Sequence, residues 1–317
     1  MLDVLRVICA RDGVFLRREA EGLGYGPSAI ARQIKEGVWH RVRRGAYTFS
    51  DIWGDLDESG RYALFTRAAY KQAQTEVILS HISAVPEHGG PLWGLDPDLV
   101  HLTRRDGRTG RKERGVQQHR GALVPGDVLH KNGVDVMSAT RTALEVTMVA
   151  PSEPALCVVN DFLHRGLTSP NLLRERYQPM DRWPDTLGTD LVLRLADGRL
   201  ESVGETRTFY MCWRHGLPAP EPQYEVRAED GSLIGRVDFA WPEYGVFLEF
   251  DGKVKYGALL RPGETATDVV VREKRREERI CEATGWRCIR ISWADLARPE
   301  LLAARIRNAL FPGSGVA

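Results

Sequence analysis

The stretch GLGYGPSAIARQIKEGVWHRVRRGAY, residues 22–47, has the pattern of a helix followed by a β-hairpin. Pro27 favours the first turn of a helix, and Gly37 favours its end. With a period of about 3.6 residues, Ile30 and Ile34 fall on one face of this helix. The opposite face carries polar and basic groups of the kind that contact base edges and phosphates, namely Ser28, Arg32, Gln33 and Lys35.

Two helices are expected before this stretch and a wing at its end. Apolar positions predict one helix over residues 2–10 and a second from Leu16 to Leu23. The segment from Trp39 to Tyr47 is typical of a β-hairpin whose basic side chains lie over phosphates, namely Arg41, Arg43 and Arg44. The pattern predicts a winged helix-turn-helix that reads DNA, although a three-helix bundle with a hairpin fits the same residues.

Residues 22–47 also resemble the winged-helix domain of AbiEi-type antitoxins, which are transcriptional autorepressors of type IV toxin-antitoxin pairs. The resemblance is close over about the first fifty residues. It implies DNA as one partner and a cognate toxin as another. A second copy of the chain is an alternative partner.

Composition and charge limit the class of protein. The 317 residues exceed what one compact core usually holds, and the net charge of +1 excludes a uniformly basic nucleic-acid coat protein. Residues 1–50 nevertheless hold nine basic side chains against five acidic ones.

Five scattered cysteines indicate neither a disulfide framework nor a structural zinc site. No apolar run approaches the ~18 residues of a membrane span, so we expect a cytoplasmic protein without a membrane partner.

The chain is expected to be an α+β multidomain protein in three blocks, residues 1–55, 56–190 and 191–317. The middle block is predicted to be mixed, with helices over 78–95 and 137–150 and a hairpin turn at Asn132-Gly133. Its polar side chains suggest a hydrolase or metal site only weakly, and helix capping and core packing are the favoured interpretation. These side chains are His81, Ser83 and His88.

The stretch IGRVDFAWPEYGVFLEFDGK, residues 234–253, predicts two strands, 234–240 and 246–251, joined by a four-residue turn. In an antiparallel pair with this turn, Trp241 lies opposite Val246. Asp238 then faces Glu249, and Arg236 faces Asp251 on the same side.

Two carboxylates whose Cβ atoms are about 5 Å apart repel each other unless a proton or a cation lies between them. Mg²⁺ or Mn²⁺ suits Asp238 and Glu249 and would activate a water molecule for phosphodiester hydrolysis. Lys253 could stabilise the developing charge. On flanking helices, Glu205 could reach the same metal and Arg276 could line a phosphate-binding cleft. The alternatives are a surface hairpin with unshared carboxylates and, around Arg276, a solvated salt-bridged helix.

The order of these elements is similar to the core of the PD-(D/E)XK nuclease superfamily, and more narrowly to the very-short-patch repair endonucleases. The resemblance rests on VDF at 237–239, EFDG at 249–252 and GWRCIR at 285–290. It implies a restriction-endonuclease-like domain over 191–317, with metal ligation by Asp238 and Glu249 assisted by Glu205. Asp251 stands where the family usually has lysine, and Lys253 is the available replacement.

Two functions follow from these patterns. The first is a DNA-binding protein that carries a magnesium-dependent endonuclease domain. The second is a transcriptional regulator or antitoxin of a type IV toxin-antitoxin system, in which the nuclease fold has no catalytic role.

Overall fold

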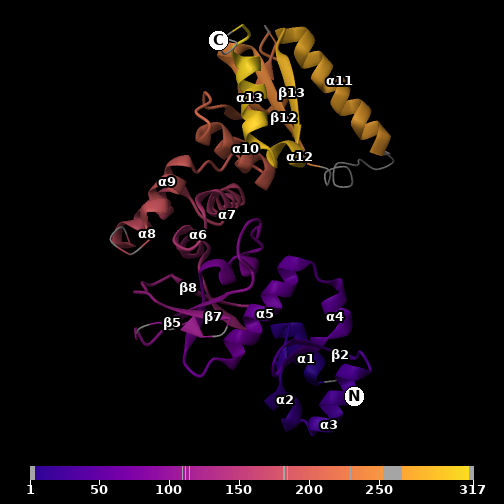
Figure 1. The fold of residues 1–317 in the computed structure, drawn as a ribbon, viewed down its shortest axis with the longest axis vertical. Helices are drawn as coiled ribbons and strands as arrows, with labels where there is room; N and C mark the ends of the chain where they lie inside the picture. Colours follow the sequence, from indigo (N-terminus) through magenta and orange to yellow (C-terminus); the bar gives the residue numbers. More distant parts are fainter. Residues whose placement is uncertain are drawn as a thin grey trace. The chain divides into compact units, whose positions relative to one another are not determined.

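A computed structural model describes residues 4–108, 110, 112–113, 115–180, 183, 185–228, 230–252 and 266–313. The chain forms two compact units, Met1–Ala196 and Asp197–Ala317 (Figure 1). The first unit contains both the segment expected as a winged helix and the segment expected as a middle domain. Helices and three β-sheets make up the described residues, in agreement with the expected α+β class.

The first unit begins with the three helices and the hairpin predicted from the sequence. A sheet of strand order β1-β3-β2 is antiparallel throughout. Its core is closed by Phe15, Trp39 and Phe49, with Ile30 packing on them from α3. The elements are α1 (Val4–Asp12), β1 (Phe15–Leu16), α2 (Arg17–Gly22), α3 (Pro27–Lys35), β2 (Trp39–Arg43) and β3 (Ala46–Phe49).

Two helices continue the chain, α4 (Ser50–Asp55) and α5 (Glu58–Gln72). The Lys71 ammonium near the end of α5 donates to Asp12 at 2.8 Å and to Glu19 at 3.0 Å. Asp12 is buried, and it also accepts from Arg11. Burial alone would raise the pKa of Asp12, but the hydrogen bonds from Arg11 and Lys71 bring it below its ordinary value. Lys71 therefore fastens α1 and α2 to α5.

We expect Lys71→Met to lower the free energy of unfolding of the winged helix by about 1–3 kcal/mol, because two carboxylates lose a largely buried cation. Arg17→Met is the matched control, since Arg17 and Glu21 form an exposed pair within α2 and such pairs contribute roughly 0–1 kcal/mol. Hydrogen exchange of peptides from α1 and α2 measures both. Equal protection in the two variants would contradict the role of Lys71.

The rest of the first unit is a six-stranded sheet of order β6-β7-β5-β4-β9-β8, followed by helices. The strands are β4 (Val77–Leu79), β5 (Val100–Arg104), β6 (Lys112–Glu113), β7 (Val116–Arg120), β8 (Val128–Lys131) and β9 (Val134–Met137). The helices are α6 (Ala139–Thr147), α7 (Ser152–His164), α8 (Pro170–Tyr177) and α9 (Leu187–Leu195). Short 3₁₀ turns cover η1 (His81–Ala84), η2 (Pro86–His88) and η3 (Gln178–Met180).

The sequence predicts part of this sheet correctly. The turn at Asn132-Gly133 joins β8 to β9 with φ values of 53° and 77°, as a two-residue hairpin turn requires. The helix predicted over 78–95 is wrong. Its apolar start is instead the buried strand β4, which pairs with both β5 and β9, and η1 and η2 follow it.

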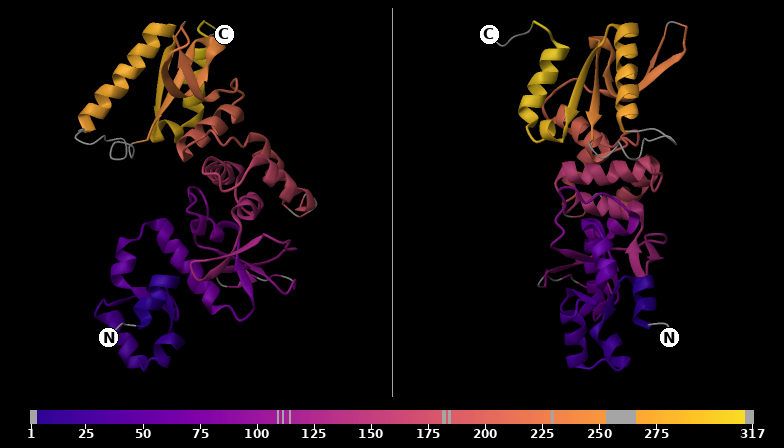
Figure 2. Two further views of the ribbon diagram at one scale, coloured as in Figure 1. Left: turned by 180° about the vertical axis from the view of Figure 1, so that it is seen from behind. Right: turned by 90° about the vertical axis from the view of Figure 1, so that its right-hand side faces the viewer.

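The second unit places one mixed sheet between helices. Strands β10 (Glu221–Arg227), β11 (Leu233–Trp241) and β12 (Val246–Asp251) are antiparallel neighbours, and β13 (Arg287–Ser292) lies parallel to β12. Figure 2 shows α11 (Ala266–Thr284) and α13 (Pro299–Leu310) on opposite faces of this sheet. The remaining elements are α10 (Val203–Arg214), η4 (Pro242–Tyr244) and α12 (Trp293–Leu296).

The predicted β11–β12 register is confirmed where the ladder is formed, because Trp241 pairs with Val246 and Phe239 with Leu248. Among the described residues, no helix combines the length and the apolar character that crossing a bilayer requires.

Candidate functional site

The outer face of α3 carries the side chains expected to read DNA. Ile30 anchors the helix in the core of the winged helix at 3% exposure. Ser28, Arg32 and Lys35 are exposed, and Gln33 is half-buried. The structure therefore places these four residues on the solvent side of a helix whose apolar side is fixed.

The hairpin that follows presents two exposed basic side chains, Arg41 and Arg44. Arg43 differs from the prediction. A register shift between Arg41 and Arg43 interrupts the two-residue alternation of β2, and the Arg43 guanidinium carbon lies 5.2 Å from the centre of the Phe65 ring in α5. Burial lowers the pKa of Arg43. Arg43 thus packs between elements of the first unit instead of lying over a phosphate.

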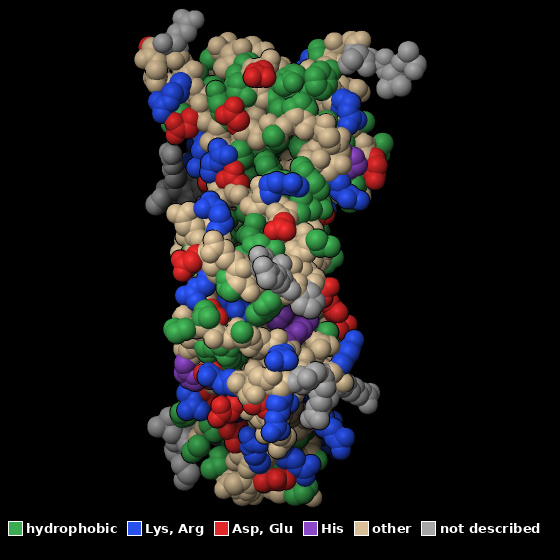
Figure 3. Space-filling view, turned by 90° about the vertical axis from the view of Figure 1, so that its left-hand side faces the viewer, with side chains coloured by type: hydrophobic (Ala, Val, Ile, Leu, Met, Phe, Trp, Pro, Cys, Tyr) green, Lys and Arg blue, Asp and Glu red, His purple; other side chains and the backbone are tan. Residues whose placement is uncertain are grey.

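Basic side chains do not form one continuous surface on the face drawn in Figure 3, where Lys and Arg alternate with Asp and Glu. This mixed surface agrees with the net charge of +1. With a net charge of only +1, contacts to DNA would depend on a small set of positioned side chains rather than on a broad positive field.

In the second unit, Asp238 and Glu249 each lie one residue beyond the last pair of the β11–β12 ladder, which joins Phe239 to Leu248. The Asp238 carboxylate accepts a hydrogen bond from the backbone N–H of Phe250 at 2.8 Å. It is thus directed toward β12, beside Glu249. The facing of the two carboxylates stays a prediction, because the paired residues of β11 and β12 end at Phe239 and Leu248.

Glu249 is half-buried, and it forms an ion pair with Arg276 of α11, Nη2 to Oε1, at 3.0 Å. Arg276 also donates to the backbone oxygen of Arg236. A guanidinium therefore balances the charge of this carboxylate in the structure. Arg276 lies on the inward face of α11, as predicted, but it contacts an acidic side chain where a phosphate-binding role was expected.

Glu205 is fully buried, and neighbouring side chains donate hydrogen bonds to its carboxylate. It accepts hydrogen bonds from the Ser202 hydroxyl at 2.7 Å and from the Gln223 amide at 2.7 Å. Glu201 precedes α10, so it does not share a helix face with Glu205, and its carboxylate pairs with Arg236. The contacts of Glu205 fix the start of α10 and its attachment to β10.

Among the described residues, Asp238, Glu249 and Glu205 do not form a close group of three possible metal ligands. Asp251 is exposed at the end of β12, and Lys253 lies outside the described residues. Metal binding by Asp238 and Glu249 therefore stays a prediction.

Sequence reasoning missed Gln223, which binds Glu205 and stands at the β10 position opposite Asp238. Its φ of 54° is a backbone conformation that non-glycine residues rarely adopt. The segment PEPQYEV contains no glycine or asparagine that would signal this positive φ.

Ser83 and His88, which the sequence favours as core residues, are buried in the first unit. The Ser83 hydroxyl accepts a hydrogen bond from the backbone N–H of His101, and a His88 ring nitrogen contacts the backbone oxygen of Met137.

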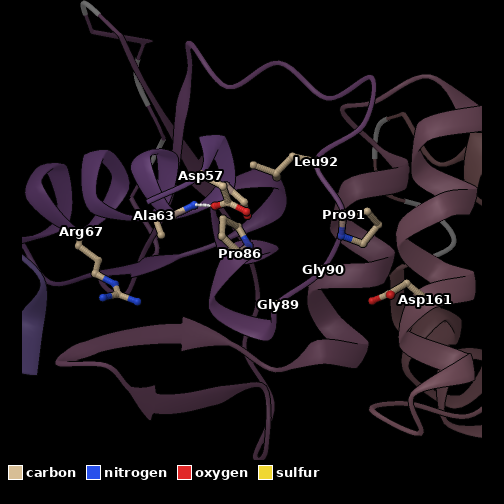
Figure 4. A pocket seen from close by; sticks show the side chains of 11 residues that line it. Asp57, Ala63, Arg67, Pro86, Gly89, Gly90, Pro91, Leu92 and Asp161 are labelled. Carbon is tan, nitrogen blue, oxygen red and sulfur yellow. Dashed lines mark hydrogen bonds between the residues drawn. The ribbon is translucent and has the colours of Figure 1, made fainter. Parts of the chain in front are cut away.

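A surface pocket of about 560 Å³ lies in the first unit, beside α5 and the segment that follows η2 (Figure 4). Asp57 and Arg67 line it from the α5 side, and Asp161 of α7 lines it from the other. The Arg67 guanidinium is held by two hydrogen bonds to Glu87 at 2.7 and 2.9 Å. None of the site residues predicted from the sequence lines this pocket.

A family model and two curated proteins match parts of the chain. Residues 4–50 match the family model described as "Transcriptional regulator, AbiEi antitoxin". Two uncharacterized proteins from two strains of Mycobacterium tuberculosis are each 37% identical to the chain over 120 residues. These matches cover 38% of the chain and 41% of each relative, so the chain spans about two fifths of the curated relatives' length.

Proposed function

We propose that the protein is a DNA-binding transcriptional regulator of the antitoxin type. The observation that carries this proposal is the orientation of α3: its apolar side is anchored through Ile30, and its polar and basic side faces solvent. The family model that matches residues 4–50 describes regulators of this type and supports the same conclusion.

In this proposal α3 enters the major groove and the hairpin follows the adjacent backbone. Arg32 and Gln33 are suited to base edges, since guanidinium and amide groups form paired hydrogen bonds to guanine and adenine respectively. Arg41 and Arg44 contact phosphates and supply affinity without sequence information. A cognate toxin is the partner that the antitoxin assignment requires.

The proposal is tested by placing the promoter upstream of the protein's own gene before a reporter and expressing the intact chain. Repression is expected, together with a gel shift by the purified protein on the same DNA. An Arg32→Ala chain, folded by circular dichroism, should repress less. A reporter unaffected by the wild-type chain, with no shift of that DNA, would contradict the proposal.

A second candidate is a metal-dependent nuclease activity of the second unit. The order α10, β10, β11, β12, α11, β13 and the direction of Asp238 toward Glu249's strand favour it. The Arg276–Glu249 ion pair opposes it, because an ion bound by both carboxylates would have to displace or share that guanidinium.

The nuclease candidate predicts cleavage of DNA by the purified chain in Mg²⁺ or Mn²⁺ and no cleavage by Asp238→Asn. The panel contains single-stranded, double-stranded and mismatched DNA. Glu243→Gln is the matched control, because Glu243 lies in the η4 turn at the other end of the same strands. Cleavage that persists in Asp238→Asn would place the activity elsewhere, and binding without cleavage would leave the regulator as the function.

A further inference from the structure

Three histidines from separate elements of the first unit meet beside its six-stranded sheet. His81 opens η1, His101 lies in β5, and His119 lies in β7. One ring nitrogen from each lies within 4.8 Å of the others. His81 and His101 are buried, and His119 is half-buried. In the part of the chain that the structure describes, no other group of three or more His, Cys, Asp or Glu side chains is gathered this closely.

The rings are arranged with nitrogen facing nitrogen. His101 Nδ1 and His119 Nε2 are 2.9 Å apart. Two unprotonated nitrogens at this distance would direct their lone pairs at each other, so a proton or a cation must lie between them. The His81 and His119 rings have centroids 3.8 Å apart, which brings the third imidazole to the same place.

The surroundings favour the neutral, metal-binding form of these rings. His81 and His101 are buried, and burial favours an uncharged imidazole over an imidazolium. Neutral imidazoles are the ligands that zinc prefers among nitrogen donors. Four-coordinate zinc with nitrogen ligands at about 2.0–2.1 Å brings those nitrogens to about 3.4 Å from one another, so small ring movements would complete the site.

A second layer of side chains holds His81. Its Nδ1 lies 3.0 Å from the Ser80 hydroxyl and 3.5 Å from a Glu145 carboxylate oxygen, and the same oxygen accepts from the His81 backbone N–H at 3.1 Å. A carboxylate beside one ring nitrogen fixes the tautomer and frees the other nitrogen for a metal. The His81 backbone adopts a φ of 51°, which a non-glycine residue rarely holds without such constraints.

Two polar atoms next to the cluster also lack a partner among the described residues. They are Oγ1 of Thr103 and Nη2 of Arg141, and both are buried. Thr103 pairs with His119 across β5 and β7, and it lies on the same side of β5 as His101 by the two-residue alternation. Buried polar groups are nearly always satisfied, so a solvent molecule or a small anion at this place is expected. Such a molecule would occupy the fourth coordination position of a three-histidine metal ion.

We propose that His81, His101 and His119 bind one divalent transition-metal ion of the zinc type, with a solvent molecule or small anion as the fourth ligand. The ion would join η1 to β5 and β7, which lie far apart in the sequence. Glu145 acts as a positioning residue through His81. This site is distinct from the Asp238–Glu249 pair, and it does not depend on the regulator or nuclease assignment.

The test uses the full chain after treatment with a chelator, which is then removed. Titration with Zn²⁺ against a chromophoric competitor is expected to give one tight equivalent. His101→Ala and His119→Gln should each weaken that equivalent by at least ~100-fold, and Glu145→Gln should weaken it by roughly 10–100-fold, as second-layer losses do. His88→Gln is the matched control, since His88 is buried outside the group, and it should retain wild-type affinity.

Two further readouts separate ligation from folding and from thiol binding. Zn²⁺ should raise the unfolding temperature of the wild-type chain and of His88→Gln but not of His101→Ala or His119→Gln. Co²⁺ should give the visible spectrum of a nitrogen and oxygen site without the charge-transfer band of a thiolate ligand. The proposal is overturned if the folded wild-type chain binds no equivalent, if both His101→Ala and His119→Gln keep wild-type affinity, or if a thiolate band appears.

Discussion

The Arg141→Met variant is expected to unfold with a free energy about 3–5 kcal/mol lower than that of the wild-type protein, because it leaves buried carboxylates without their cation. Arg141 is 4% exposed; it donates to Glu145 at 2.8 Å and to Asp127 at 3.2 Å. Its guanidinium also lies 4.7 Å from the centre of the Trp183 ring. Asp127 retains a contact with Arg176 at 3.4 Å, whereas Glu145 loses its ion pair with Arg141.

The pKa of Glu145 indicates how strongly this carboxylate depends on its partner. Burial raises the pKa of Glu145, while the charge and hydrogen bond of Arg141 oppose that rise. Removing the Arg141 guanidinium removes its lowering effect on the pKa of Glu145. The pKa of Glu145 should therefore rise further, and its carboxyl group should be protonated more readily in the variant.

Hydrogen exchange of peptides from α6 and β4 measures the effect within the first unit. Arg105→Met is the matched control, because Arg105 forms an ion pair with Asp135 in which the side chains are 36% and 27% exposed, respectively. The free energy of unfolding of this variant is expected to fall by roughly 0–1 kcal/mol. Glu145→Gln added to Arg141→Met should recover part of the stability, since it removes the stranded charge. A loss in Arg141→Met no larger than in Arg105→Met would contradict the assigned role.

The sequence predicts the elements whose signals are local. Helix α3 follows from the spacing of Ile30 and Ile34 between Pro27 and Gly37, and the β11–β12 register follows from a four-residue turn. Both are confirmed. In each case the deciding residues lie within about 20 positions of one another, so periodicity and turn chemistry are sufficient.

The contacts that the sequence does not predict join residues that are far apart along the chain. His101 meets His119 only through the parallel register of β5 and β7, and Glu205 meets Gln223 only after β10 returns beside α10. Arg43 is turned inward by one register shift in β2. The composition of segment 78–95 favours a helix. Its first residues instead belong to strand β4, which pairs with β5 on one side and β9 on the other. Pairing within the sheet therefore overrides the local preference.

Arg32→Ala and Arg41→Ala are expected to affect DNA binding in different ways. Loss of Arg32 removes a side chain placed to contact a base, so affinity for the preferred site should fall by about 1–3 kcal/mol, and preference should relax at one position. Loss of Arg41 removes a phosphate contact, so affinity should fall to a similar extent for every sequence, and the slope of log Kd against log salt should decrease by about 1.

Fluorescence anisotropy with a panel of single-position variants of the preferred site, at several salt concentrations, measures both effects. Arg17→Ala is the control, because Arg17 belongs to α2 and its guanidinium is paired with Glu21. An Arg32→Ala chain that loses affinity equally on every duplex would contradict base contact by this side chain.

The most direct measurement of the central claim is the affinity of the intact chain for a site selected from random DNA, compared with a scrambled duplex at the same salt concentration. The account predicts that the selected site binds at least ~1,000-fold more tightly, and that DNA protects α3 and the β2–β3 hairpin from hydrogen exchange. Equal affinity for both duplexes, or protection confined to the second unit, would contradict a regulator that reads DNA with its winged helix.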